Sequence, residues 1–172
     1  DFDWQRFRPA AERFFEWEEA EARGAAPEWG SAFLNRLTEA GRERPTLGAY
    51  AGDGRLALLR LRNDLDLAGA LPDLFAGLRR LDVVILHRLL LEEVLDVDRQ
   101  AVREERNLDY VREFDEAVGR VDAGRGEVAF LMNATPVDAV WESALAGHAL
   151  PQKSTDFYPK LLSGLTIYKV EN

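Results

Sequence analysis

The sequence predicts an α/β fold, with an α+β arrangement as the other possibility, built around a mixed β-sheet of about five to six strands flanked by helices. Two observations lead to this prediction. The last third of the chain alternates short apolar runs with amphipathic helical patterns, which is typical of layered α/β domains. In the first half, Gly52-Asp53-Gly54 separates two strand-like runs, and a hairpin of this kind makes the sheet mixed rather than purely parallel.

The composition indicates one globular domain. The chain has 172 residues, 47% hydrophobic and 31% charged, so we expect a single domain over residues 1–172. Its formal net charge is −9 without any dense run of Lys and Arg, which argues against nucleic acid and anionic membranes as partners. The absence of Cys, with only two His, predicts no metal site. Because no apolar stretch has membrane-spanning length and no signal peptide is visible, we expect a cytoplasmic protein.

The first elements along the chain are a short helix over 4–13, interrupted by Pro9, and an extended stretch around 14–17. A second helix over 27–41 is indicated by apolar residues at every fourth position, namely Trp29, Phe33 and Leu37. The runs 46–51 and 55–62 then predict the two strands of the hairpin.

The middle of the chain is expected to be mainly helical. Pro72 opens a short predicted helix to about residue 78. The long apolar run over 83–95 favours helix over strand because of its length. The highly charged residues 96–106 predict a surface segment, and a hinge is expected there if the domain has one.

The last third predicts strands at 108–111, at 128–132 and around 165–167. The strand at 128–132 is continuously apolar, as expected of a strand buried on both faces. Between these strands the spacing predicts a helix over 114–121 and another over 136–145. Thr135 is the predicted N-cap of the second helix, whose apolar positions are Val137, Val140, Trp141, Ala144 and Leu145.

The segment 151–160 has the composition of a binding site. Lys153, Ser154 and Thr155 combine an ammonium charge with hydroxyl donors, as an anion cradle requires, and Lys160 adds a second charge. Two prolines stiffen the segment, which lowers the cost of ordering it on binding. The segment is not a P-loop, because the glycine pattern of that motif does not precede the lysine.

A structural role for the same segment is the alternative. Ser and Thr commonly cap turns, so Thr155 would close a turn within the chain. Phe157 and Tyr158 would then fill the core instead of contacting a ligand.

Asn133 is a second candidate, because it follows a predicted strand and precedes a helix. Ligands tend to bind at the carboxyl ends of strands in open α/β sheets, and helix N-termini attract anions. The alternative is simple capping of the helix by Thr135. Of the two histidines, His148 is the candidate general acid or base because it lies close to 151–160, although a surface position after the helix is the alternative. His87 lies among apolar residues, which predicts a core contact.

Four segments carry a resemblance to a known family: LDVVILH at 81–87, NLDYV at 107–111, AFLMNATPV at 129–137 and PQKSTDFYPKL at 151–161. Together they resemble the domain of unknown function 1015 family of bacteria and archaea, from about residue 46 to the C-terminus. The last segment is the most specific, and Asp156 departs from the aromatic residue expected there.

The resemblance implies that this chain is the C-terminal portion of a longer protein, as its start at Asp1 rather than Met also suggests. The implied N-terminal half is similar to the ParB/sulfiredoxin-like fold, which elsewhere supports nucleotide-dependent phosphoryl transfer. Any nucleotide cofactor would therefore bind through that half.

These observations predict the C-terminal domain of a cytoplasmic enzyme that binds a small phosphorylated or nucleotide ligand, with phosphoryl transfer as its reaction. The residues expected to bind the ligand are Lys153, Ser154, Thr155, Lys160, Asn133 and Tyr158, with His148 as the candidate catalytic residue. The alternative is a non-catalytic scaffold or interaction module. In that case 151–160 would pack on the N-terminal half or on a second subunit, forming a homo-oligomer in the latter case.

Overall fold

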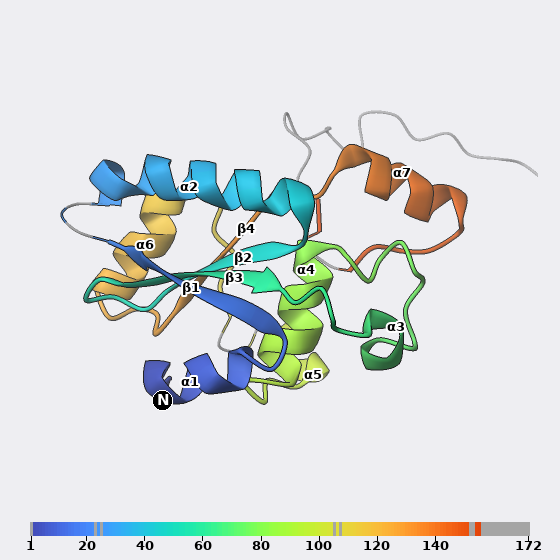
Figure 1. Cartoon of the computed structure of the whole chain (residues 1–172), viewed down its shortest axis with the longest axis horizontal. Coiled ribbons are helices and arrows are strands. Elements are labelled where there is room, and N and C mark those ends of the chain that lie inside the picture. Colours follow the sequence, from blue (N-terminus) through green and yellow to red (C-terminus); the bar gives the residue numbers. More distant parts are fainter. Residues whose placement is uncertain are drawn as a thin grey trace, which may run out of the picture.

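The computed structural model describes residues 2–22, 24, 26–104, 106, 108–151, 154 and 155. Within these residues the chain is α+β, with one four-stranded sheet in the order β1-β3-β2-β4, antiparallel throughout (Figure 1). The strands are β1 (Phe15–Glu21), β2 (Thr46–Tyr50), β3 (Arg55–Leu61) and β4 (Ala129–Met132). The expected mixed sheet with more strands is therefore wrong for the described part of the chain.

Helices cover both faces of the sheet. Figure 1 shows α2 and α6 over one face, and α1 with the continuous α4–η1 helix over the other. The helices are α1 (Trp4–Ala11), α2 (Ala26–Glu43), α3 (Leu67–Ala70), α4 (Asp82–Ile85), the π-helix η1 (Leu86–Glu92), α5 (Arg99–Arg103), α6 (Phe114–Asp122) and α7 (Val137–Leu145). The helices predicted over 4–13, 27–41, 114–121 and 136–145 are confirmed. No helix in the described residues is long and apolar enough to cross a membrane.

The β2–β3 hairpin forms as its turn sequence predicts. Gly52, Asp53 and Gly54 all have positive φ, at 72°, 50° and 75°, which glycine adopts freely and Asp tolerates. The register pairs Leu47 with Leu59. Because side chains alternate along a strand, Leu56 and Leu58 of β3 face α2, and the alternate residues Ala57, Leu59 and Leu61 face α1 and η1.

Helix α2 lies unusually close to the sheet at Gly48. A Cβ atom built there would lie 2.8 Å from Cε1 of Phe33 on α2 and 3.0 Å from Cβ of Leu131 on β4. Glycine at this position therefore lets the Phe33 ring rest directly on the β2 backbone.

The apolar run 83–95 is helical, as predicted, but most of it is a π-helix. Helix α4 continues directly into η1, and the amide of Leu95 donates to the carbonyl of Leu90 at 2.9 Å, a bond that spans five residues. The wider winding buries Leu89, Leu90 and Leu91, three consecutive residues. A π-helix is rare and is found most often near functional sites.

Several predicted elements differ from the structure. Residues 72–78 form turns instead of a helix, and the short helix α3 precedes them, capped by Asp66, whose Oδ1 accepts from the Ala68 amide at 3.0 Å. Residues 108–111 form no strand, so α6 follows no strand and the expected β-α-β unit does not form. Strand β4 lies at an edge of the sheet and is only partly buried, not buried on both faces. The strand predicted around 165–167 lies outside the described residues.

Candidate functional site

Only Pro151, Ser154 and Thr155 of the segment 151–160 are described. Ser154 is 7% exposed, and both its amide, at 3.3 Å, and its hydroxyl, at 2.6 Å, donate to the carbonyl of Pro151. The Ser154 hydroxyl therefore closes a local turn and donates within the chain. Thr155 is exposed.

The other predicted ligand residues of this segment, Lys153, Tyr158 and Lys160, lie outside the described residues, as does Phe157. An anion site at 151–160 therefore stays a prediction.

Asn133 holds three elements together at the end of β4. Its Nδ2 lies 3.1 Å from Oδ2 of Asp82, 3.3 Å from the carbonyl of Thr46 and 3.4 Å from the carbonyl of Leu37. A Cβ atom on Gly41 of α2 would lie 2.4 Å from this nitrogen, so the amide is wedged against α2. The contacts explain Asn133 as a packing residue that joins β4 to α2, β2 and α4.

Asp82, at the start of α4, completes this contact and is a residue that the sequence analysis did not select. Its Oδ2 also accepts from the backbone amide of Asn133 at 3.3 Å. Burial raises the pKa of Asp82, while the hydrogen bonds from Asn133 and from the Thr46 backbone oppose that shift. The available signal was an Asp directly before a long apolar run, since acidic residues favour helix N-termini.

His87 on η1 makes the predicted core contact. Its side chain is 9% exposed, and its Nε2 lies 3.4 Å from the hydroxyl of Tyr110. Burial lowers the pKa of His87, and the charge of Glu92 opposes this shift. Tyr110, from the segment expected to be a strand, thus packs on the π-helix instead of joining the sheet.

His148 lies at the surface after α7. Its ring stacks on that of Phe75, with centroids 4.5 Å apart and planes 20° apart. Its backbone amide donates to the carbonyl of Ser143 at 2.9 Å, which ends the helix. These contacts agree with the surface alternative, and a catalytic role for His148 stays a prediction.

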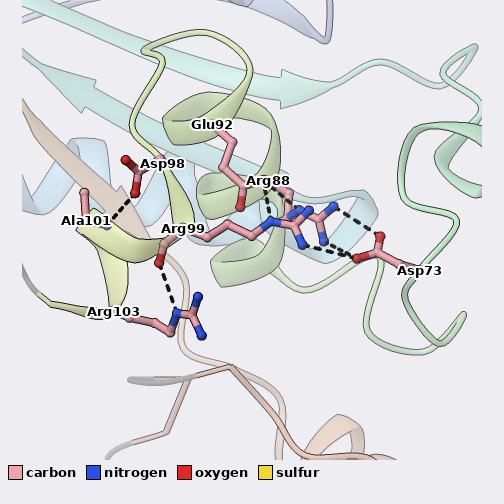
Figure 2. A network of polar contacts seen from close by, with 7 residues as sticks. All are labelled: Asp73, Arg88, Glu92, Asp98, Arg99, Ala101 and Arg103. Carbon is pink, nitrogen blue, oxygen red and sulfur yellow. Dashed lines mark hydrogen bonds and ion pairs between the residues drawn. The ribbon is translucent and has the colours of Figure 1, made fainter.

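A network of ion pairs fastens the outer side of η1 (Figure 2). Arg88 of η1 forms two hydrogen bonds to the carboxylate of Asp73, at 3.0 and 3.1 Å. Oε2 of Glu92 accepts from Nε of Arg88 at 3.1 Å and from Nε of Arg99 at 2.9 Å. Asp98 caps α5 through the amide of Ala101 at 2.7 Å.

Internal carboxylates satisfy both guanidinium groups of this network. The side chains of Arg88 and Glu92 are only 16% and 17% exposed. We interpret the network as a clamp that joins the turn at Asp73, the π-helix and α5, and not as an anion site.

Among the described residues, carboxylates outnumber arginines in the lining of two surface hollows. The first, of about 240 Å³, lies between α2 and the strands β1 and β3; its charged lining residues are Glu18, Arg36, Glu39, Glu43 and Arg60. The second, of about 450 Å³, lies between the hairpin and the turn after α6; its charged lining residues are Asp53, Arg55, Asp122 and Glu127. Neither contains a predicted ligand residue, and the acidic lining disfavours phosphate. Within the described residues, no group of His, Asp and Glu is placed to hold a metal ion.

Helix α7 packs on the protein with the opposite face from the one its sequence predicts. Val137, Trp141 and Leu145 are 69%, 67% and 73% exposed, whereas Ser143 is 2% exposed. The Ser143 hydroxyl donates to the carbonyl of Ala139 at 2.8 Å, so the buried face carries a satisfied polar group. Figure 1 shows α7 at the periphery, beyond the end of α2.

We call Val137, Trp141 and Leu145 the α7 stripe, because their spacing of four residues aligns them along one side of the helix. Of the large apolar side chains exposed in the described residues, three form this stripe, and Phe75 is the fourth, at 38%. Single exposed apolar residues are common on protein surfaces, but aligned ones indicate an interaction surface. The geometry therefore supports a docking surface more directly than a pocket.

Comparison with known protein families, with curated proteins and with solved structures found no match. The resemblance to the domain of unknown function 1015 family therefore stays a proposal. One of its motifs, 81–87, contacts two others in the structure, through Asp82–Asn133 and His87–Tyr110.

Proposed function

We propose that this domain is a non-catalytic interaction module and that the α7 stripe is its docking surface for a partner protein. The observation that supports this most directly is the exposure of Trp141, at 67%, in the centre of an aligned apolar face. Tryptophan is among the residues that most often dominate binding energy at interfaces. A helix that buries serine and exposes tryptophan is unfavourable unless another surface covers the tryptophan.

The organisation of the remaining polar residues is consistent with this proposal. The polar groups that the sequence singled out, on Asn133 and Ser154, bond within the chain. Carboxylates outnumber arginines in the lining of both described hollows, which does not suit the phosphorylated or nucleotide ligand that the sequence analysis expected. A scaffold whose polar motifs hold the core and whose apolar helix faces outward accounts for both observations.

Two partners are candidates. The family resemblance suggests the first, the N-terminal half of a longer protein, and the interaction-module hypothesis adds the second, another subunit of the same chain. Calorimetric titration of the chain with that N-terminal half tests the first, and sedimentation velocity of the chain across a wide concentration range tests the second.

Trp141→Ala is the informative variant in both experiments, and Phe75→Ala is its matched control, because Phe75 is the other large exposed aromatic side chain among the described residues and stacks on His148, outside the α7 stripe. We expect association that Trp141→Ala weakens by at least about 30-fold, as at an interface hot spot, and that Phe75→Ala leaves nearly unchanged. The proposal is overturned if Trp141→Ala leaves the affinity of the association unchanged, or if the chain associates with neither partner.

A further inference from the structure

We propose that the partner segment that docks on the α7 stripe is a basic amphipathic helix. This inference rests on the proposed function and specifies the chemistry of the partner. It follows from the charges that border the stripe, from its size and from the charge of the whole chain.

The border of the α7 stripe is negatively charged on one side. Asp138 and Glu142 each follow a stripe residue by one position, which places them about 100° around the helix, next to Val137 and Trp141. Both are exposed, and neither has an ion-pair partner among the described residues. The sequence from 126 to 151 contains no Lys or Arg, so no positive charge in this stretch balances them.

Such a border selects a partner that carries positive charge beside its apolar residues. An amphipathic helix presents apolar side chains at intervals of three and four residues, which matches the spacing of Val137, Trp141 and Leu145. Lys or Arg on the edge of that helix would lie against Asp138 and Glu142 and pair with them.

The size of the stripe also suits one helix. Even if Trp141 buries about 200 Å², the three side chains together fall well short of the roughly 800 Å² that each side of a stable dimer buries. A second copy of this chain is further disfavoured because it would bring its own Asp138 and Glu142, and a net charge of −9, toward the same charges.

The test compares two synthetic helical peptides of about 15 residues that share one leucine stripe. One carries Lys on its polar face and the other carries Glu, and fluorescence anisotropy measures the Kd of each for the full chain. We expect the Lys peptide to bind and the Glu peptide to bind at least about tenfold more weakly. Trp141→Ala should weaken binding of the Lys peptide by at least about 30-fold.

A basic peptide can also bind any acidic protein without specificity, so charge controls decide the result. The double variant Asp138→Asn/Glu142→Gln should weaken binding of the Lys peptide about threefold to tenfold. The pair Glu39→Gln/Glu127→Gln removes the same charge away from α7, from exposed positions with no ion-pair partner among the described residues, and should change the Kd less than twofold. Equal effects of the two pairs would overturn the proposal.

The remaining outcomes are also decisive. If the Glu peptide binds as well as the Lys peptide and both depend on Trp141, the basic character of the partner is wrong while the docking surface stands. If the chain forms a dimer and Trp141→Ala abolishes it, the occupant of the stripe is a second copy of the chain. If the Lys peptide binds only after the chain is truncated after Thr155, then residues 156–172 are the segment that occupies the stripe. Either assignment, or no binding of either peptide, overturns the inference; the proposed function itself is judged by the association experiments with Trp141→Ala.

Discussion

Replacement of Asn133 by Ala measures how strongly the contact among β4, α2 and α4 stabilises the fold. The Nδ2 group has two hydrogens, so of its three neighbouring oxygens it satisfies at most two at full strength. One bond goes to the carboxylate of Asp82, worth about 1.5–3 kcal/mol, and one to a carbonyl, worth about 0.5–1.5 kcal/mol. We therefore expect Asn133→Ala to lower the free energy of unfolding by about 2–4 kcal/mol.

Urea unfolding followed by circular dichroism, with linear extrapolation to water, gives this free energy. Thr135→Ala is the matched control: Thr135 lies two residues away, and α7 begins at Val137, after Pro136 as its N-cap, without a side-chain cap. It should change stability by no more than about 0.5 kcal/mol. A loss below about 1 kcal/mol for Asn133→Ala would show that this contact does not hold the elements together.

Asn133→Asp should give a pH dependence of stability that a simple loss of packing does not produce. The new carboxylate would lie beside that of Asp82, and two adjacent carboxylates cannot both stay ionised without cost, so the folded variant binds a proton more tightly than the unfolded chain. Its stability should consequently rise as the pH falls from neutrality toward the ordinary carboxylate pKa. Asn133→Ala should show a smaller rise, because it removes a hydrogen bond that opposes the raised pKa of Asp82 but adds no second carboxylate.

Four further predictions concern other parts of the fold. Because burial lowers the pKa of His87, the unfolded chain binds its proton more readily, and stability should fall as the pH drops below about 6.5; His87→Gln should flatten this dependence in urea titrations at several pH values. Gly48→Ala should cost about 1–3 kcal/mol by pressing on Phe33, measured by thermal unfolding. Arg88→Met should cost about 1–2 kcal/mol, and the difference should shrink at high salt. If 151–160 binds an anion, nucleotides or phosphorylated amino acids should raise the Tm and Lys153→Ala should abolish the rise; no rise in the unmodified chain contradicts the ligand hypothesis.

Local patterns predicted the elements whose own residues determine their conformation. The four-residue spacing of Trp29, Phe33 and Leu37 predicted α2, and the Gly-Asp-Gly turn predicted the hairpin. In both cases the signal is contained in a few neighbouring residues. The structure confirms these elements to within a few residues at each end.

The elements that failed depend on contacts far along the chain. The apolar residues at 108–111 predicted a strand, but Tyr110 instead contacts His87 on the π-helix, and the segment is half-buried there without joining the sheet. Without a strand at 108–111 the predicted β-α-β unit does not form, and the sheet of the described residues is antiparallel. Periodicity detects which residues avoid water, but it does not say which surface covers them.

The dependence on contacts between distant residues also explains why the sequence did not predict the roles of the candidate site residues. The sequence singled out Asn133 as a ligand residue, and that role stays a prediction; the packing role that the structure shows could not be predicted, because its partner Asp82 is distant in sequence. For α7 the spacing located the apolar positions Val137, Trp141 and Leu145. It could not show that this side faces outward while Ser143 faces inward, because that choice depends on how the helix packs against the rest of the fold.

Three of the four motifs on which the proposed family resemblance rests meet where the α4–η1 helix joins the rest of the fold. Asp82 and Asn133 join its first residue to β4, and His87 and Tyr110 hold its π-helical part. Polar groups occupied in this way stabilise the fold, so variants at these positions would weaken any function indirectly, through unfolding. Because the α7 stripe contributes little to the core, variants at Trp141 separate partner binding from folding, and this difference is what makes the docking proposal testable.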